Sequence, residues 1–233
     1  MSDVTAHPIS KRWPADNPEL LQLYSYPTPN GVKVSIALEE MGIAYEPHLV
    51  TLSDADVKSP EFLSLNPNNK IPAIIDPNGP DGAQVELFES GAILLYLAEK
   101  SGQLIGKTAA DKATVTQWLM FQMGGLGPMF GQLGYFSKFA GSEIEDPRPR
   151  QRYIDEGKRL LNVLNLHLEG RDWVAGDYSI ADIAIAPWLN ALNFYGTKDV
   201  LEWESFPNVV AYLDRFMARP AVQKGLNIPA RPE

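Results

Sequence analysis

The chain has 233 residues and no cysteine, and its 29 acidic and 20 basic side chains give a net charge of −9. This length can bury a core without disulfides, and the lack of cysteine excludes disulfide scaffolds, thiolate metal sites and cysteine nucleophiles. The acidic balance argues against nucleic acid or an anionic membrane as a partner. His7, His48 and His167 are too far apart in sequence to indicate a metal site.

Residues 1–19 are polar and lack the apolar stretch of a signal peptide, so we expect an N-terminal extension before the fold. The longest apolar run, Ala92 to Ala98, is far shorter than the ~20 residues of a membrane span. A cytoplasmic location is therefore expected. A small anionic ligand would need a locally positive site in so acidic a chain.

Residues 20–102 alternate strand and helix signals. The hairpin turn PNGPDG joins the last two predicted strands, and Gly42 and Gly102 are expected to end helices. This order predicts a parallel β-α-β unit, a hairpin and a final helix, which together form a compact α/β domain. The predicted strands are 20–26, 45–52, 71–76 and 85–88, the predicted helices are 30–41 and 90–100, and 60–65 is expected to be a short helix or a turn.

After a link at 103–107, residues 108–233 have helical periodicity only, which predicts an all-α domain. Ser179 and Asp182 have the spacing of a capping box, in which each side chain bonds the other's backbone N–H. Residues 140–149 are expected to be a loop. The predicted helices are 109–123, 150–168, 180–192 and 208–217.

Thr28 and Asn30 stand between the first predicted strand and the first predicted helix, where open α/β sheets place ligands. The helix start offers N–H groups to an anion or thiolate, although a turn with a simple helix cap explains the same residues. Lys70 and Ile71 precede Pro72. A cis Ile71–Pro72 bond would turn the Ile71 backbone toward a peptide-like ligand, but trans is the usual form, and a lysine at such a position is more often solvated than a ligand anchor.

Glu89 and Ser90 stand where the last strand meets a helix, so they suit either capping or the binding of an amino acid head group. The glycines between Gly124 and Gly131 lack the spacing and the preceding strand of a nucleotide loop, which favours close helix packing or a bend. Arginines 148, 150 and 152 fit a solvated helix start or an anion contact.

Four segments in this order resemble the cytosolic glutathione transferases: LYSYPTPNGVKVSIALEE, SPEFLSLNPNNKIPAIID, LFESGAILLYLAEK and YSIADIAIAPW. The resemblance covers Leu21 to Pro220 and is strongest to the bacterial nu-class branch and its fungal nitrogen-regulator relatives. It implies a thioredoxin-like N-terminal domain, an all-helical C-terminal domain and a homodimer that uses glutathione as co-substrate, without a metal.

The resemblance also implies roles for single residues. Thr28 and Asn30 match the residues that face the glutathione sulfur. Ile71 matches the residue before a cis-proline, whose backbone pairs with the cysteinyl part of glutathione, and Lys70 is expected near the glycyl carboxylate. Glu89 and Ser90 match the γ-glutamyl site.

Two further positions are less direct. Arg152 matches an arginine that reaches glutathione in close relatives. The branch often has a glutamine shortly before the PEF segment, where this chain has Asp54-Ala-Asp-Val-Lys58, so one glutathione contact is in doubt and Lys58 is the candidate substitute. Other transferase classes use a catalytic tyrosine, and therefore Tyr24 and Tyr26 are alternatives to Thr28.

The resemblance implies a glutathione-dependent disulfide-bond reductase or organic peroxidase, acting on a small disulfide or hydroperoxide with glutathione or oxidised glutathione bound. Conjugation of glutathione to an electrophile is one alternative. A non-catalytic glutathione-binding regulatory protein is another, although the short N-terminal segment is not Asn-rich as in the regulatory relative. Without cysteine, the chain cannot form a mixed disulfide with its substrate.

Overall fold

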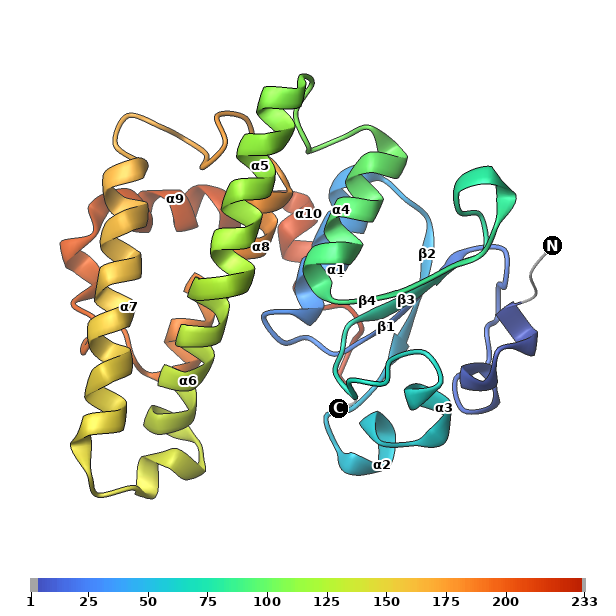
Figure 1. Cartoon of the computed structure of the whole chain (residues 1–233), viewed down its shortest axis with the longest axis horizontal. Coiled ribbons are helices and arrows are strands. Elements are labelled where there is room, and N and C mark those ends of the chain that lie inside the picture. Colours follow the sequence, from blue (N-terminus) through green and yellow to red (C-terminus); the bar gives the residue numbers. More distant parts are fainter. Residues whose placement is uncertain (1–3, 232–233) are drawn as a thin grey trace. The chain divides into compact units, whose positions relative to one another are not determined.

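The computed structural model describes residues 4–231, and the chain divides into two compact units (Figure 1). The described part of the first unit consists of residues 4–103 and 220–231, and the second unit is Leu104–Arg219. The division after residue 103 falls at the expected link. The thioredoxin-like fold and the all-α fold predicted for the two halves are both present.

The first unit is built on a mixed sheet with the strand order β2-β1-β3-β4. Strand β1 pairs in parallel with β2 and antiparallel with β3, and β3 pairs antiparallel with β4. The predicted β-α-β unit and hairpin are therefore confirmed. The strands are β1 (Leu21–Ser25), β2 (Tyr45–Leu49), β3 (Ala73–Asp76) and β4 (Val85–Phe88).

Helices α1 (Gly31–Met41) and α4 (Ser90–Ser101) pack against each other in this unit. Each ends as predicted at a left-handed glycine, Gly42 with φ 66° and Gly102 with φ 67°. Two short helices follow β2. They are α2 (Asp54–Val57) and α3 (Pro60–Leu63).

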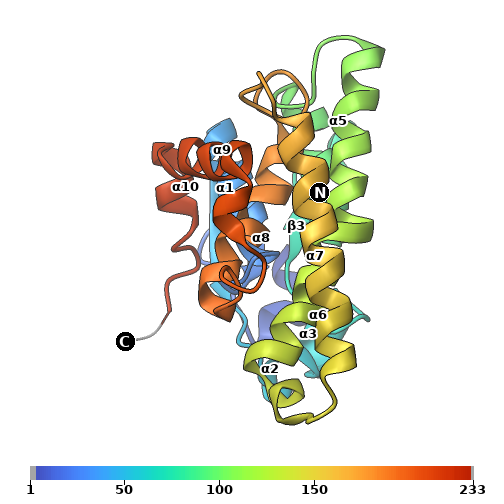
Figure 2. The same ribbon diagram turned by 90° about the vertical axis from the view of Figure 1, so that its left-hand side faces the viewer.

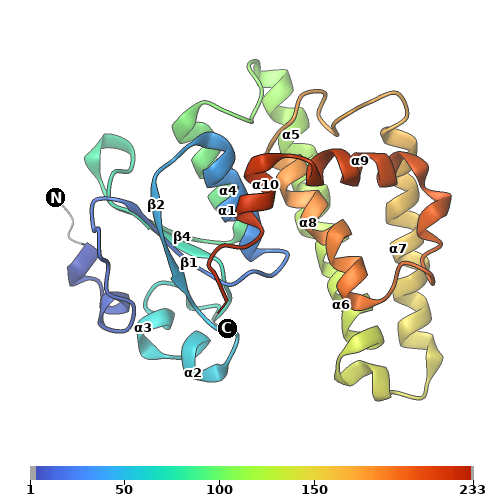
Figure 3. The same cartoon turned by 180° about the vertical axis from the view of Figure 1, so that it is seen from behind.

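The C-terminal segment returns to the first unit, whereas the sequence placed all of 108–233 in the helical domain. Helix α10 (Pro220–Gly225) lies beside α1 (Figure 3). The Ser35 hydroxyl donates to the Gly225 carbonyl at 2.7 Å, and a Cβ on Gly225 would lie 2.7 Å from the Ile36 backbone. The two segments in contact are about 190 positions apart in sequence. Local hydrophobic periodicity cannot predict a contact between segments so far apart.

The expected polar extension also differs from the structure, because part of it is packed in the core. Short 3-10 turns at Val4–Ala6 and Pro8–Lys11 leave Val4 1% exposed and Ile9 fully buried. Both belong to one apolar cluster with Tyr24 and Phe62. Val4 and Ile9 stand among polar residues, so the average composition of residues 1–19 is polar. For this reason the composition did not predict that these two side chains are buried. Residues 1–3 lie outside the described range.

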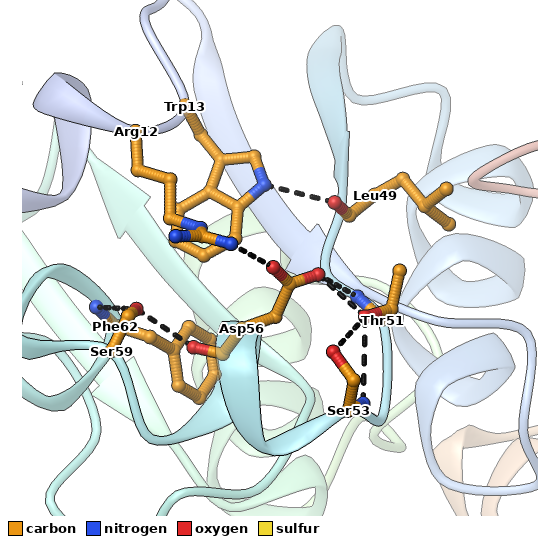
Figure 4. A network of polar contacts seen from close by, with 8 residues as sticks. All are labelled: Arg12, Trp13, Leu49, Thr51, Ser53, Asp56, Ser59 and Phe62. Carbon is orange, nitrogen blue, oxygen red and sulfur yellow. Dashed lines mark hydrogen bonds and ion pairs between the residues drawn. The ribbon is translucent and has the colours of Figure 1, made fainter.

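A polar network ties this N-terminal segment to α2 (Figure 4). The Arg12 guanidinium donates to Asp56, which also accepts from the Thr51 N–H at 2.8 Å and the Thr51 hydroxyl at 2.6 Å. The Trp13 indole N–H donates to the Leu49 carbonyl at 2.9 Å. Burial alone would raise the pKa of Asp56, but the hydrogen bonds from Thr51 and Arg12 outweigh burial and lower it.

The second unit is helical (Figure 2). A π-helical turn at Gln122–Leu126 joins the first two helices, and a Cβ on Gly127 or on Gly131 would lie 3.3 Å from the Trp188 ring. Close helix packing is therefore confirmed for Gly127 and Gly131, whereas Gly124 and Gly125 lie in the π turn, where a Cβ would meet nothing closer than 3.8 Å. The helices are α5 (Ala109–Phe121), α6 (Gly127–Lys138), α7 (Pro147–His167), α8 (Ile180–Tyr195) and α9 (Pro207–Met217).

The start of α7 lies earlier than expected. Asp146 accepts a hydrogen bond from the Arg148 N–H at 3.0 Å and caps a helix that begins at Pro147, inside the region predicted as a loop. A 3-10 turn at Ala140–Glu143 occupies the other end of that region. The predicted capping box of α8 is confirmed, with Ser179 and Asp182 bonded in both directions.

Candidate functional site

The first candidate segment is the loop that leads from β1 into α1. The Thr28 N–H donates to the Tyr26 carbonyl at 2.7 Å, and the Thr28 hydroxyl oxygen accepts from the Gly31 N–H at 3.3 Å. Thr28 therefore takes part in capping α1. A hydroxyl that accepts an N–H bond still has its own hydrogen to donate, so capping and donation to a thiolate are compatible. Thr28 and Asn30 are both half-buried.

The tightness of this loop depends on Gly31. A Cβ at this position would lie 1.9 Å from the Tyr26 carbonyl oxygen and 2.6 Å from the Ser25 hydroxyl oxygen. A backbone carbonyl cannot move aside as a flexible side chain can, so a larger residue at 31 would force the loop open. Glycine at this position therefore fixes Thr28 against the start of α1.

The two alternative tyrosines differ in their surroundings. Tyr24 is fully buried and stacks on His48 with 4.6 Å between ring centroids. Burial, with a contribution from Glu46, raises its pKa, so Tyr24 does not fit a residue that activates a thiol at the surface. Tyr26 is half-buried, and the Arg231 guanidinium lies 5.4 Å from its ring.

The second segment precedes β3. Its Ile71–Pro72 bond is cis, as the family resemblance implied. The Asn66 side-chain amide donates to the Lys70 carbonyl at 2.5 Å and holds the turn, while the Lys70 side chain is exposed. Ile71 stands two residues before the start of the β3 ladder at Ala73. Its backbone therefore lies at the edge of the sheet, where a peptide-like ligand could pair with it.

The third segment is the junction of β4 and α4. Glu89 has φ 71° and ψ 110°, an uncommon conformation for a residue with a side chain. Such backbone outliers concentrate at functional sites. The Glu89 side chain is exposed and Ser90, the first residue of α4, is buried. The junction thus presents a carboxylate and a hydroxyl at a helix start.

The strand register brings these three segments to one edge of the sheet. Ala73 pairs with Tyr24 on one side and with Phe88 on the other. The loop after β1, the turn before β3 and the junction after β4 therefore leave the sheet at neighbouring positions. Six of the predicted site residues are thereby gathered at one place: Thr28, Asn30, Lys70, Ile71, Glu89 and Ser90.

Sequence reasoning missed Lys33, which lies directly behind this site. Its side chain is fully buried, and its ammonium donates to the Ser90 hydroxyl oxygen at 3.4 Å. Burial lowers the pKa of Lys33 to about 7, and Glu89 acts in the opposite direction. The available signal was a single lysine within the apolar run of a predicted helix, between Val32 and Val34.

Two predicted residues do not belong to these three segments. Arg152 belongs to the second unit, on α7, where it lines a surface hollow with Arg148 and Tyr153. Its contact with glutathione stays a prediction. Lys58 is exposed and forms an ion pair with Asp54 at 2.8 Å, and its replacement of a glutamine also stays a prediction.

Within residues 4–231, no cluster of three or more His, Asp or Glu side chains could hold a metal ion. The described helices are also too short or too polar to cross a membrane.

Comparison with known proteins identifies the family. Residues 19–99 match the model for the N-terminal domain of glutathione S-transferase, and residues 129–220 match the model for its C-terminal domain. The disulfide-bond oxidoreductase YfcG of Escherichia coli is 44% identical over 209 residues, which cover 89% of this chain and 94% of YfcG.

Two solved structures are similar over nearly their whole length. A glutathione transferase from Pseudomonas putida, with one glutathione disulfide bound per subunit, is 59% identical with a TM-score of 0.97 over 98% of this chain and 100% of that chain. One from Burkholderia graminis, with two glutathione molecules bound per subunit, is 63% identical with a TM-score of 0.97 over 100% and 98%. The chain belongs to the glutathione S-transferase family.

Proposed function

We propose that the protein is a glutathione-dependent disulfide-bond reductase that activates the glutathione thiol with Thr28 and Asn30. The observation that carries the proposal is the Thr28 hydroxyl, fixed at the start of α1 in a chain with no cysteine. The name of YfcG and the bound glutathione disulfide of the Pseudomonas putida structure support it.

The proposed activation lowers the pKa of the glutathione thiol. A free thiol has a pKa near 8.5, so only about 3% is thiolate at pH 7. Lowering the pKa by about two units requires roughly 2.7 kcal/mol of preferential stabilisation of the thiolate. Hydrogen bonds from the Thr28 hydroxyl and from Asn30, together with the N-terminus of α1, supply groups of the kind that provide it.

The proposed binding mode distributes the rest of glutathione over the same sheet edge. The Ile71 backbone pairs with the cysteinyl residue, Lys70 attracts the glycyl carboxylate, and Glu89 and Ser90 hold the γ-glutamyl group. Arg152 is the further residue that we propose to contact glutathione. The positive charges of Lys70 and Arg152, with the hydrogen-bond donors, offset the overall charge of −9 around an anionic ligand.

The reaction needs two glutathione molecules for each disulfide. The first loses its thiol proton to water, and its thiolate attacks one sulfur of the substrate, forming a glutathionyl mixed disulfide and releasing the other sulfur as a thiolate that takes up a proton. A second glutathione thiolate attacks the glutathionyl sulfur, giving oxidised glutathione and the second substrate thiol. Two glutathione molecules per subunit in the Burkholderia graminis structure are consistent with this sequence.

The test compares three substrates with glutathione and purified protein. We expect the highest turnover with hydroxyethyl disulfide and a measurable rate with cumene hydroperoxide. In the second reaction two glutathione molecules reduce one hydroperoxide, giving the alcohol, water and oxidised glutathione. Faster conjugation of chlorodinitrobenzene would contradict the proposal. Turnover with none of the three would favour a glutathione-binding regulatory protein.

The proposed homodimer is tested by light scattering on the same sample, where a monomer mass would contradict it.

A further inference from the structure

Lys33 carries a buried charge on α1 that the proposed chemistry does not use. It is fully buried on α1, with Val32 and Val34 also buried on either side. Moving an ammonium out of water is costly unless acceptors or opposite charge surround it. The Glu89 carboxylate, directly before the start of α4, acts on Lys33 through its charge. On α10, which also packs against α1, Lys224 forms an ion pair at 2.7 Å with Glu39, six residues after Lys33 on α1.

The contact with Ser90 has a defined direction. An ammonium has three hydrogens and no acceptor, so the Ser90 oxygen accepts in the 3.4 Å contact with Lys33. The Ser90 hydroxyl hydrogen is therefore directed away from Lys33. Helices α1 and α4 pack side by side (Figure 1). The contact with Ser90, the first residue of α4, therefore places the Lys33 ammonium next to the start of this helix. A hydroxyl donor and a helix N-terminus backed by a positive charge suit a carboxylate.

We propose that Lys33 is a positioning residue for glutathione, whose ammonium orients the Ser90 hydroxyl and supplies buried positive charge for the α-carboxylate of the γ-glutamyl group. The inference rests on the proposed function, since it assigns that carboxylate to the start of α4. A carboxylate bound there also stabilises the ammonium form of Lys33, whose pKa burial has lowered to about 7. Lys33 thus acts through Ser90 and the local field without touching the reacting sulfur.

The experiment measures the binding of two peptides by calorimetry: glutathione, and γ-aminobutyryl-cysteinyl-glycine, which lacks only the α-carboxylate. For Lys33→Met we expect about tenfold weaker binding of glutathione, the size of a lost charge-assisted contact. The truncated peptide should bind within about twofold of its wild-type affinity. Lys33→Arg keeps the positive charge and should bind glutathione more tightly than Lys33→Met does.

Two further variants keep the test decisive. Lys33→Gln retains a donor to Ser90 but lacks the charge, so it replaces Lys33→Met if that variant does not fold, and its loss should again be confined to glutathione. Ile36→Val, a buried change on the same helix, controls for general loosening and should leave both affinities unchanged. Equal weakening of both peptides, or unchanged glutathione binding, would overturn the inference. If the wild-type protein itself fails to bind glutathione, the proposed function fails instead.

Discussion

Helices α5 and α8 of the second unit begin differently from helices α1 and α4 of the first unit. In the second unit, α5 and α8 start with complete capping boxes, Thr108 with Asp111 and Ser179 with Asp182. In the first unit, neither Asn30 before α1 nor Glu89 before α4 forms a side-chain capping bond within residues 4–231. The starts of α5 and α8 are thus satisfied by the protein's own side chains. At α1 the Thr28 hydroxyl accepts from the Gly31 N–H, and in our account a ligand supplies the further acceptors at the starts of α1 and α4.

The difference has an energetic consequence. A side-chain cap contributes about 1 kcal/mol to a helix, so an uncapped start costs stability that a bound anion can restore. Removing a cap in the helical unit should therefore lower the stability of the protein. Changing the start of α1 or α4 in the α/β unit should instead weaken the binding of glutathione. The following substitutions test this division from the largest effect to the smallest.

Asp182→Ala should produce the largest loss of stability. Buried Asp182 accepts from the Val174 N–H at 3.1 Å, the Ser179 N–H at 2.9 Å and the Tyr212 hydroxyl at 3.1 Å. Alanine leaves these buried donors without their acceptor, which costs about 3 kcal/mol or more. Urea unfolding followed by circular dichroism measures the change. A loss no greater than that of Thr108→Ala would show that burial adds nothing to this cap.

Saturating glutathione should raise the melting temperature, since a ligand at about 100 times its Kd stabilises the folded state by about 2.7 kcal/mol.

Ser90→Ala should weaken binding by about tenfold, as expected for a lost hydrogen bond to a charged group. At a fixed glutathione concentration it therefore removes part of the stabilisation. The melting temperature without ligand should also fall, because the buried Lys33 ammonium loses its Ser90 acceptor, but the rise that glutathione produces should become smaller, which differential scanning fluorimetry can check. A glutathione-induced rise equal to that of the wild type would contradict a binding role for Ser90.

Thr108→Ala should cost about 1 kcal/mol, the ordinary value of an exposed cap, and should leave glutathione affinity unchanged. Calorimetric titration of this variant is the matched control for Ser90→Ala, because both change the start of a helix. Weaker glutathione binding by Thr108→Ala would break the division between the two units.

The pH dependence of stability provides a smaller and separate test. Burial raises the pKa of Asp182 from 3.8 to about 6, against hydrogen bonds that lower it. Between these values the folded state holds a proton that the unfolded state has lost, so this group contributes stability that is lost as pH rises through about 6. Asp182→Asn lacks this titration. Its melting temperature relative to wild type should therefore be higher at about pH 7.5 than at about pH 5, and a constant difference would contradict the assignment.

Local features were the most accessible from the sequence. The Ser179 capping box and the glycine that ends α1 depend on residues a few positions apart, and both are confirmed. The packing of Ile9 and the return of α10 to α1 depend on contacts between distant segments. Periodicity within a window contains no information about such contacts, so the extension and the end of the helical domain were misplaced.

The candidate site shows the same limit. Thr28, Ile71 and Ser90 were found because the resemblance gave their motifs, and the strand register explains why three separate segments meet. Lys33 lies within the first of the four segments that carry the resemblance, but the resemblance gave it no role, and its sequence neighbours predict only a buried helix face. Its position behind Ser90 became visible once the packing of α1 on α4 was known.

The pKa of the glutathione thiol in the bound complex tests the central claim most directly. Thiolate absorbance in the ultraviolet, followed during a pH titration of the complex, reports this value. The account predicts a pKa about two units below the free value near 8.5 in the wild-type protein, in Thr28→Ser and in Tyr26→Phe. For Thr28→Ala it predicts a return toward the free value. A thiol pKa that stays low in Thr28→Ala, or rises in Tyr26→Phe, would contradict it.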